Sequence, residues 1–99
     1  MNATQSFQTI DVQTWMGTDI LGSRDQGRQL RTFLAERIDQ MQSIVLDFIS
    51  IDVMTSAFTD ECFGKLWDSF GAESVKAIIH IRGLTGNNKA IFRFVLANR

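Results

Sequence analysis

The chain has 99 residues, 44% of them hydrophobic and 10% aromatic, which suits one compact domain over residues 1–99. Ten lysines and arginines stand against eleven aspartates and glutamates, so the formal net charge of −1 does not favour nucleic-acid binding. One cysteine and one histidine exclude an internal disulfide and the ligand set of a structural zinc site, and a reducing cytoplasm is expected.

The first predicted elements are a short strand and a long helix. Residues Phe7 to Val12 resemble a strand. Further along, Ser23 and Gln26 form the S-x-x-Q pattern of a capping box, which predicts a helix from about Arg24 to Gln40. Its apolar residues recur at helical spacing and are Leu30, Phe33, Leu34, Ile38 and Met41.

The middle of the chain predicts a central strand and a second helix. Residues 43–49 are rich in β-branched side chains and apolar on both faces, which is typical of the middle of a sheet. The apolar run 44–51 includes Asp47 and is too short to cross a bilayer, so we expect a soluble protein without membrane contact. The second helix should begin near Ser56, and Gly71 should end it in the left-handed region. Its apolar stripe consists of Phe58, Cys62, Phe63, Leu66, Trp67 and Phe70.

The last third of the chain predicts a strand, a turn and a helix. Apolar and polar residues alternate from Val75 to Ile81, as in a strand with one better buried face. The sequence GLTGNN, residues 83–88, predicts a turn, after which Asn87 or Asn88 would cap a helix from about Lys89 to Ala97. The order β-α-β-α-β-α predicts a small single-domain α/β fold with a three- to four-stranded, mostly parallel sheet and about three helices.

Two predicted loops follow the carboxyl ends of strands, which is where open parallel sheets carry their binding sites. The second strand leads into Asp52, Thr55 and Ser56, and the third leads into Arg82 and residues 83–88. Ser and Thr are preferred helix N-caps, so Thr55 and Ser56 are explained by capping unless another function is shown. We expect these two loops to lie near one another.

Charged residues around these loops have structural and functional interpretations. Asp47 lies late in an apolar strand, and a structural carboxylate that accepts loop amides is favoured over a site carboxylate. Asp60 and Glu61 lie in the first turns of the second helix. They are either solvated charges that favour the helix dipole or partners of Arg24 or Arg28.

Two segments resemble the STAS-like family of unknown function, which in turn resembles the STAS domains of bacterial anti-sigma-factor antagonists. They are LGSRDQGRQLR (21–31) and VLDFISIDVMTSAFTDECFG (45–64). The similarity covers roughly residues 17–97, and the pattern LDF...TSAFTDE is its most specific part. The resemblance implies a STAS-like α/β domain without catalysis of its own and a protein partner, for example a histidine-kinase-like regulatory ATPase.

The resemblance also implies a phosphorylation site at the start of the second helix. Anti-sigma-factor antagonists carry Asp-Ser-Ser-Gly there, and a partner kinase phosphorylates one serine. The strand aspartate of the family falls on Asp47, and the Asp-Ser-Ser positions fall on Thr55, Ser56 and Ala57. Because Ala57 has no hydroxyl, a phosphoryl group could be accepted only by Ser56 or Thr55. A helix start favours such a group through its free N–H groups and its dipole.

These observations predict a non-enzymatic regulatory module that binds another protein, switched by phosphorylation at the second helix. The expected docking residues are Asp52, Thr55, Ser56, Thr59, Asp60, Glu61 and Arg24. The alternative is a small-ligand or nucleotide-binding domain that uses the same strand ends. Neither hypothesis requires a metal or another cofactor.

An enzyme is disfavoured, and self-association stays open. Any activated nucleophile would depend on His80, and Cys62 lies on the predicted buried stripe. Core filling is the default interpretation of Trp15, Met16 and Phe94, but an exposed cluster of the three would mark a partner or homodimer face. Such a face is expected if three helices leave one side of the sheet uncovered.

Overall fold

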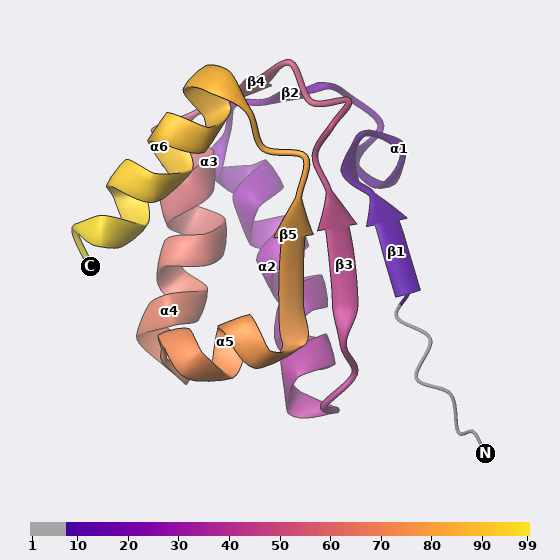
Figure 1. Cartoon of the computed structure of the whole chain (residues 1–99), viewed down its shortest axis with the longest axis vertical. Coiled ribbons are helices and arrows are strands. Elements are labelled where there is room, and N and C mark those ends of the chain that lie inside the picture. The colour runs from indigo at the N-terminus through magenta and orange to yellow at the C-terminus, as the bar shows by residue number, and fades with distance from the viewer. Residues whose placement is uncertain (1–7) are drawn as a thin grey trace.

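The main sheet of the protein has three parallel strands (Figure 1). The computed structural model describes residues 8–99, so Phe7 of the first predicted strand lies outside the described residues. The strands are β1 (Gln8–Asp11), β3 (Ile44–Asp47) and β5 (Ile79–Arg82), in the order β1-β3-β5. The predicted central position of the second strand of this sheet is confirmed.

One face of this sheet is covered by helices. In Figure 1 helix α2 (Arg24–Asp39) lies behind the strands. Along β3 the side chains of Ile44 and Leu46 are buried, whereas Val45 between them is half-buried. The paired register places Val45 beside His80 of β5. The opposite face of the described sheet is therefore the more exposed one, as the alternation of strand side chains requires.

The capping box of α2 is confirmed. The Gln26 amide donates to the Ser23 hydroxyl (3.1 Å), and the Ser23 amide donates to Gln26 Oε1 (3.0 Å). Leu30, Leu34 and Ile38 recur along the buried side of the helix, as predicted. Met41 was expected on the same stripe, but it follows the helix at a φ of 56° and is 77% exposed.

The second long helix is continuous but not uniform. It consists of α3 (Ser56–Thr59), a π-helical turn η1 (Asp60–Gly64) and α4 (Lys65–Phe70). Gly71 ends it with φ 84° and ψ 147°, so the predicted left-handed conformation is wrong although φ is positive.

The strand predicted over residues 75–81 is wrong in its first half. Helix α5 (Ala72–Ile78) occupies that part, and β5 begins only at Ile79. Val75 and Ile78, one helical turn apart, are both buried, while the intervening Lys76 and Ala77 are exposed. Buried residues three positions apart fit one face of a helix, just as alternating residues fit one face of a strand. The Ala, Glu and Lys residues of this segment have high helix propensity and favour the helix.

Three short elements were not predicted. Helix α1 (Val12–Met16) follows β1, with the Asp11 side chain as its N-cap. Strands β2 (Ile20–Leu21) and β4 (Val53–Met54) pair in parallel as a second, two-stranded sheet. Two-residue strands leave no periodic pattern that a sequence could show.

The last helix, α6 (Gly86–Ala97), begins three residues earlier than predicted. Thr85 occupies the N-cap position, so Asn87 and Asn88 lie inside the helix and their assignment as caps is wrong. None of the helices within residues 8–99 is both long and apolar enough to cross a membrane.

The proposed aromatic cluster does not form. Trp15 of α1 packs on Phe33 of α2, with ring centroids 5.2 Å apart, and the Arg37 guanidinium lies over the Phe33 ring. Phe94 is 69% exposed on α6, and Figure 1 shows α1 and α6 on opposite sides of the molecule. Trp15 and Phe94 therefore cannot share one contact face.

Candidate functional site

The start of α3 is built around the hydroxyl of Thr55. The Phe58 amide donates to this hydroxyl oxygen (3.2 Å), which makes Thr55 the N-cap. The same hydroxyl donates to the Gly22 carbonyl (3.1 Å) just before α2. The Thr55 amide also donates to the Leu21 carbonyl (3.0 Å). Thr55 thus connects the N-termini of the two long helices, and its hydroxyl proton is already engaged by a backbone carbonyl.

Ser56, the first helical residue, has a different environment. Its side chain is exposed, and none of the hydrogen bonds formed by residues 8–99 uses its hydroxyl. Of the two predicted phosphoacceptors, Ser56 is therefore the accessible one. Ala57 beside it is half-buried, and Phe58 is fully buried.

Near the N-terminus of α3, which we call the α3 entrance (Thr55 and Ser56), Glu61 is the centre of an ion-pair network. Its side chain is 8% exposed and pairs with Arg31 (2.8 Å), Lys65 (3.2 Å) and Arg24 (3.2 Å). Hydrogen bonds from Arg31 and Lys65 lower the pKa of Glu61 to about 2, against the opposing effect of burial. Arg31 also donates to the Glu61 backbone carbonyl (2.5 Å). Glu61 is accordingly a structural anion that joins α2 to η1.

Asp60 extends the network toward the surface. Arg24 pairs with it at 2.9 Å, and Arg99 near the end of the described chain pairs with both Asp60 and Asp68. The Arg24 guanidinium lowers the pKa of the Asp60 carboxyl. Of the two interpretations left open for Asp60 and Glu61, the structure shows pairing, and the partner is Arg24, whereas Arg28 pairs with Asp25.

The predicted docking residues divide by accessibility. Thr59 is fully buried and its hydroxyl donates to the Thr55 carbonyl (2.8 Å), and Glu61 is buried as well. A partner cannot reach either side chain in this conformation. Both residues instead stabilise the conformation of the helix on which the exposed residues lie. The exposed residues of this set are Arg24, Asp52 and Ser56, and Thr55 and Asp60 are half-buried beside them.

Asn88 is a site residue that the sequence analysis placed wrongly. It is 9% exposed and lies in the first turns of α6. Its Oδ1 accepts the Met54 amide (3.0 Å), and its Nδ2 donates to the Ile51 and Asp52 carbonyls (3.2 and 3.3 Å). The sequence does indicate that Asn88 is buried, because Asn88 lies four residues before Phe92 and therefore on the apolar side of the helix.

The carboxyl ends of β3 and β5 meet through Asp47. Its Oδ1 accepts the amide of Ile49 (3.0 Å), as expected of a structural carboxylate, and its Oδ2 pairs with Arg82 (3.2 Å). Gly83 follows with a φ of 82°, and a Cβ there would lie 2.6 Å from Asp47 Oδ1. The loops that follow β3 and β5 therefore lie next to each other, as predicted, and the charges of Asp47 and Arg82 neutralise one another.

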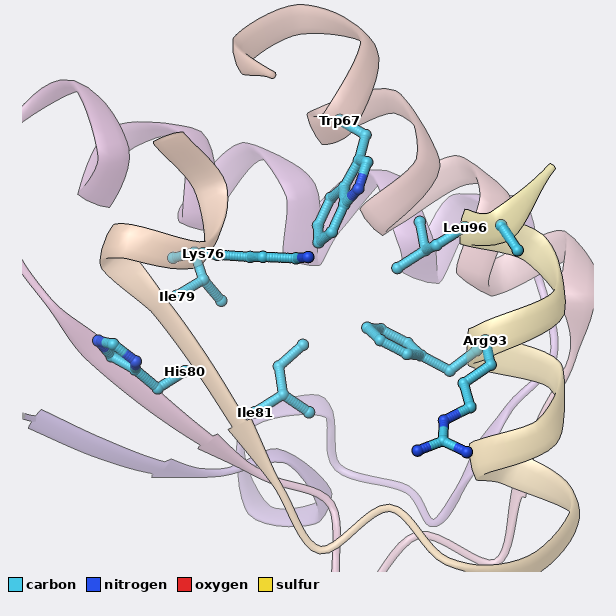
Figure 2. Close-up of a pocket in the computed structure, with 9 residues that line it drawn as sticks. Trp67, Lys76, Ile79, His80, Ile81, Arg93 and Leu96 are labelled. Atoms are coloured by element: carbon cyan, nitrogen blue, oxygen red, sulfur yellow. The ribbon is translucent and has the colours of Figure 1, made fainter. Parts of the chain in front are cut away.

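The two residues weighed as parts of an enzyme occupy separate environments. Cys62 is fully buried in η1, and burial raises the pKa of its thiol well above the ordinary value. The thiol is therefore held protonated. His80 lies on β5, and Figure 2 shows its ring turned away from the side chains of Ile79 and Ile81.

Comparison with known protein families places most of the described chain in one of them. Residues 26–89 match the profile of a family described as a STAS-like domain of unknown function. The matched range contains most of α2, the whole α3–η1–α4 segment and the first turn of α6. Neither the curated proteins nor the solved structures yield a match to this chain.

Proposed function

We propose that this chain, which belongs to the family of STAS-like domains of unknown function, is a non-enzymatic regulatory module that docks another protein at the start of α3. The observation that carries the proposal is the exposed hydroxyl of Ser56, which no group of residues 8–99 engages, at the N-terminus of a well-anchored helix. The Thr55 cap and the Glu61 network hold α2 and α3 in place without using the surface groups. A preorganised surface of this kind favours binding, because little conformational entropy remains to be lost.

Ser56 is also the residue we propose as phosphoacceptor. A phosphoryl group adds about −1.5 to −2 charges at neutral pH. Ser56 and Asp60 lie four residues apart and therefore on one side of the helix. The new anion would repel Asp60 and compete with it for Arg24, whose side chain is 55% exposed. Phosphorylation would thus change the charge of the docking surface and loosen one of its ion pairs.

A histidine-kinase-like regulatory ATPase is the partner class that we propose. The one cysteine of the chain, Cys62, is a buried free thiol, which fits the reducing cytoplasm in which we propose that both proteins act. Catalysis by this chain itself is not part of the proposal, because the Cys62 thiol is buried and protonated.

The test begins with a search of the genes beside this one for a histidine-kinase-like ATPase, which is then purified. The two proteins are mixed with Mg-ATP, and phosphorylation is followed by intact mass and peptide mapping. We expect one phosphoryl group on Ser56 and none on Thr55. Ser56→Ala should abolish the label while leaving the melting temperature unchanged, because the hydroxyl makes no hydrogen bond within the described residues.

Docking is tested separately by titration calorimetry without ATP. Asp52→Arg inverts an exposed charge of the docking surface and should weaken binding on the order of tenfold. Glu73→Arg makes the same change on the exposed side of α5 and should leave the affinity unaltered. Equal effects of the two substitutions would refute docking at α3, and a label on Thr55 would refute the assignment of Ser56.

A further inference from the structure

The cationic side chains of this protein differ in whether they are neutralised. All ten lysines and arginines lie within the described residues. Ion pairs engage seven of them, namely Arg24, Arg28, Arg31, Arg37, Lys65, Arg82 and Arg99. Across residues 8–99, no ion pair or side-chain hydrogen bond involves Lys76, Lys89 or Arg93. These three cations line one seam, between β5 and α6.

This seam, which we call the β5–α6 groove, consists of two adjoining hollows of about 640 and 300 Å³. They share Ile81, Phe92 and Arg93, so they form one continuous depression. Among the described residues that line them, none is an aspartate or a glutamate. The apolar residues of the lining are Trp67, Ile79, Ile81, Leu84, Phe92, Leu96 and Ala97.

Figure 2 shows how the charged groups lie around the larger hollow. Lys76 extends into it from α5, close to Trp67, and Arg93 lies across from β5 on α6. Ile81 lies between them on the strand. Lys89 adds the third cation in the smaller hollow, near the start of α6. The positive charge is therefore distributed along the groove and not gathered at one point.

One wall of the groove is the outer edge of an edge strand. β5 has β3 as its single neighbour in the described sheet. The Phe48 amide donates to the Arg82 carbonyl, so the backbone of Arg82 faces β3. Because successive residues of a strand direct their backbone groups to opposite sides, the amide and carbonyl of Ile81 face the outer edge. An edge of this kind is a template for an added strand.

We propose that the β5–α6 groove binds an extended, acidic peptide segment of a partner protein, which pairs as an additional strand with β5. Side chains of an added strand point alternately to its two sides. Apolar side chains that enter the groove would contact Trp67 and Phe92. The long, exposed side chains of Lys76, Lys89 and Arg93 line the same groove and would meet the acidic side chains of the peptide. A single anionic headgroup would be bound best by cations clustered at one point. Three cations spread along an edge strand are instead complementary to a series of carboxylates along an extended peptide.

The groove and the α3 entrance use different residues, so this proposal does not depend on the proposed function. The first experiment is a screen of ten-residue peptides in which apolar and acidic residues alternate. The hits are titrated into the ¹⁵N-labelled full chain. We expect shifts of the Ile79 to Arg82 amides and an affinity that falls as salt concentration rises. Peptides with lysine at the acidic positions should not bind.

Charge-inverted variants locate the site. Lys76→Glu and Arg93→Glu should each weaken peptide binding by about tenfold. Arg28→Glu makes the same change of charge on the exposed side of α2 and should leave binding unchanged. Because all three side chains are exposed, the amide spectrum of each variant should report an intact fold.

The remaining outcomes separate strand addition from other ligands. N-methylation of the peptide amides that face β5 should abolish binding, while N-methylation of the alternate amides should preserve it. Equal binding by both methylated peptides would overturn strand pairing. A screen without any acidic hit, equal binding by lysine peptides, or shifts of the same amides by dodecanoate alone would overturn the acidic-peptide proposal.

Discussion

At the scale of single residues, Asn88 joins two parts of the chain that are far apart in sequence. Its amide group satisfies one backbone N–H and two backbone carbonyls of residues 51–54, the loop that leads into α3. Buried backbone groups without partners cost free energy, so this loop depends on α6 for its conformation. Asn88 thereby supports the entrance at Ser56 from a residue that no partner touches.

Substitution of Asn88 tests this dependence. Asn88→Ala leaves the buried Met54 amide without its acceptor, and we expect a loss of about 2–3 kcal/mol in the free energy of unfolding. Asn87→Ala, the exposed neighbour in the same turn, should change it by less than about 0.5 kcal/mol. Urea titrations of the two variants provide the measurement. Because alanine has the higher helix propensity, a loss is not expected from propensity, and equal losses in the two variants would contradict a special role of the Asn88 hydrogen bonds.

At the scale of elements, the contact of α2 with η1 requires a glycine. A Cβ on Gly27 would lie 2.8 Å from the Phe58 carbonyl oxygen and 2.9 Å from Glu61 Cβ. Neither atom belongs to the flexible end of a side chain, so the two helices would have to separate. Their close approach is also what brings Arg24 and Arg31 within reach of Glu61. The geometry of the network thus follows from the absence of a side chain at Gly27.

Gly27→Ala therefore tests the helix pair. In an exposed helix this substitution stabilises by roughly 1 kcal/mol, because alanine has the higher helix propensity. Here overpacking should outweigh that gain, and we expect a net loss of about 1–2 kcal/mol. Gly22→Ala, just before the N-cap of α2, is the control for the added volume alone, since the nearest atom to its added Cβ would be Thr55 Cγ2 at 3.9 Å. Thermal unfolding measures both, and a stabilised Gly27→Ala protein would contradict the close packing.

At the scale of the whole molecule, ion pairs connect elements that the hydrophobic core alone would not orient. Glu61 and Asp60 bind cations from α2, α4 and the end of the chain. Both carboxyls have pKa values below their ordinary ones. A carboxyl whose pKa is lower in the folded state than in the unfolded state stabilises the fold once it is ionised. The molecule should therefore lose stability in acid.

The pH range of that loss follows from Glu61. Its pKa falls from 4.5 to about 2 on folding, so its contribution is complete above about pH 4.5 and disappears as the pH falls toward 2. We expect the urea midpoint of Glu61→Gln to lie below that of the parent protein at pH 7 and to approach it near pH 2. Glu73→Gln, which removes an exposed carboxylate of α5, is the control. Parallel curves for parent and Glu61→Gln would contradict the role of the network.

Local sequence patterns were sufficient for the main outline of this protein. The capping box of Ser23 and Gln26 involves groups within one helical turn, so its residues predicted the start of α2 correctly. Residues 43–49 were recognised as a central strand from their apolar, β-branched side chains, but the implied cover on both faces is wrong, because Ile44 and Leu46 are buried whereas Val45 on the other face is half-buried. The order of the main strands and helices, and the family resemblance, followed from such patterns.

The remaining features depend on contacts between distant residues. The helix over Ala72–Ile78 competes with an equally consistent strand, and the packing of Val75 and Ile78 against the core selects between them. The partners of Asn88 and Glu61 lie 30 or more positions away in sequence, except Lys65. These partners can be identified only from the tertiary structure, in which the helices pack against one another. The β5–α6 groove also depends on tertiary structure. Lys76 and Arg93 line the same hollow only after the chain has folded, and no periodic pattern in the sequence relates them.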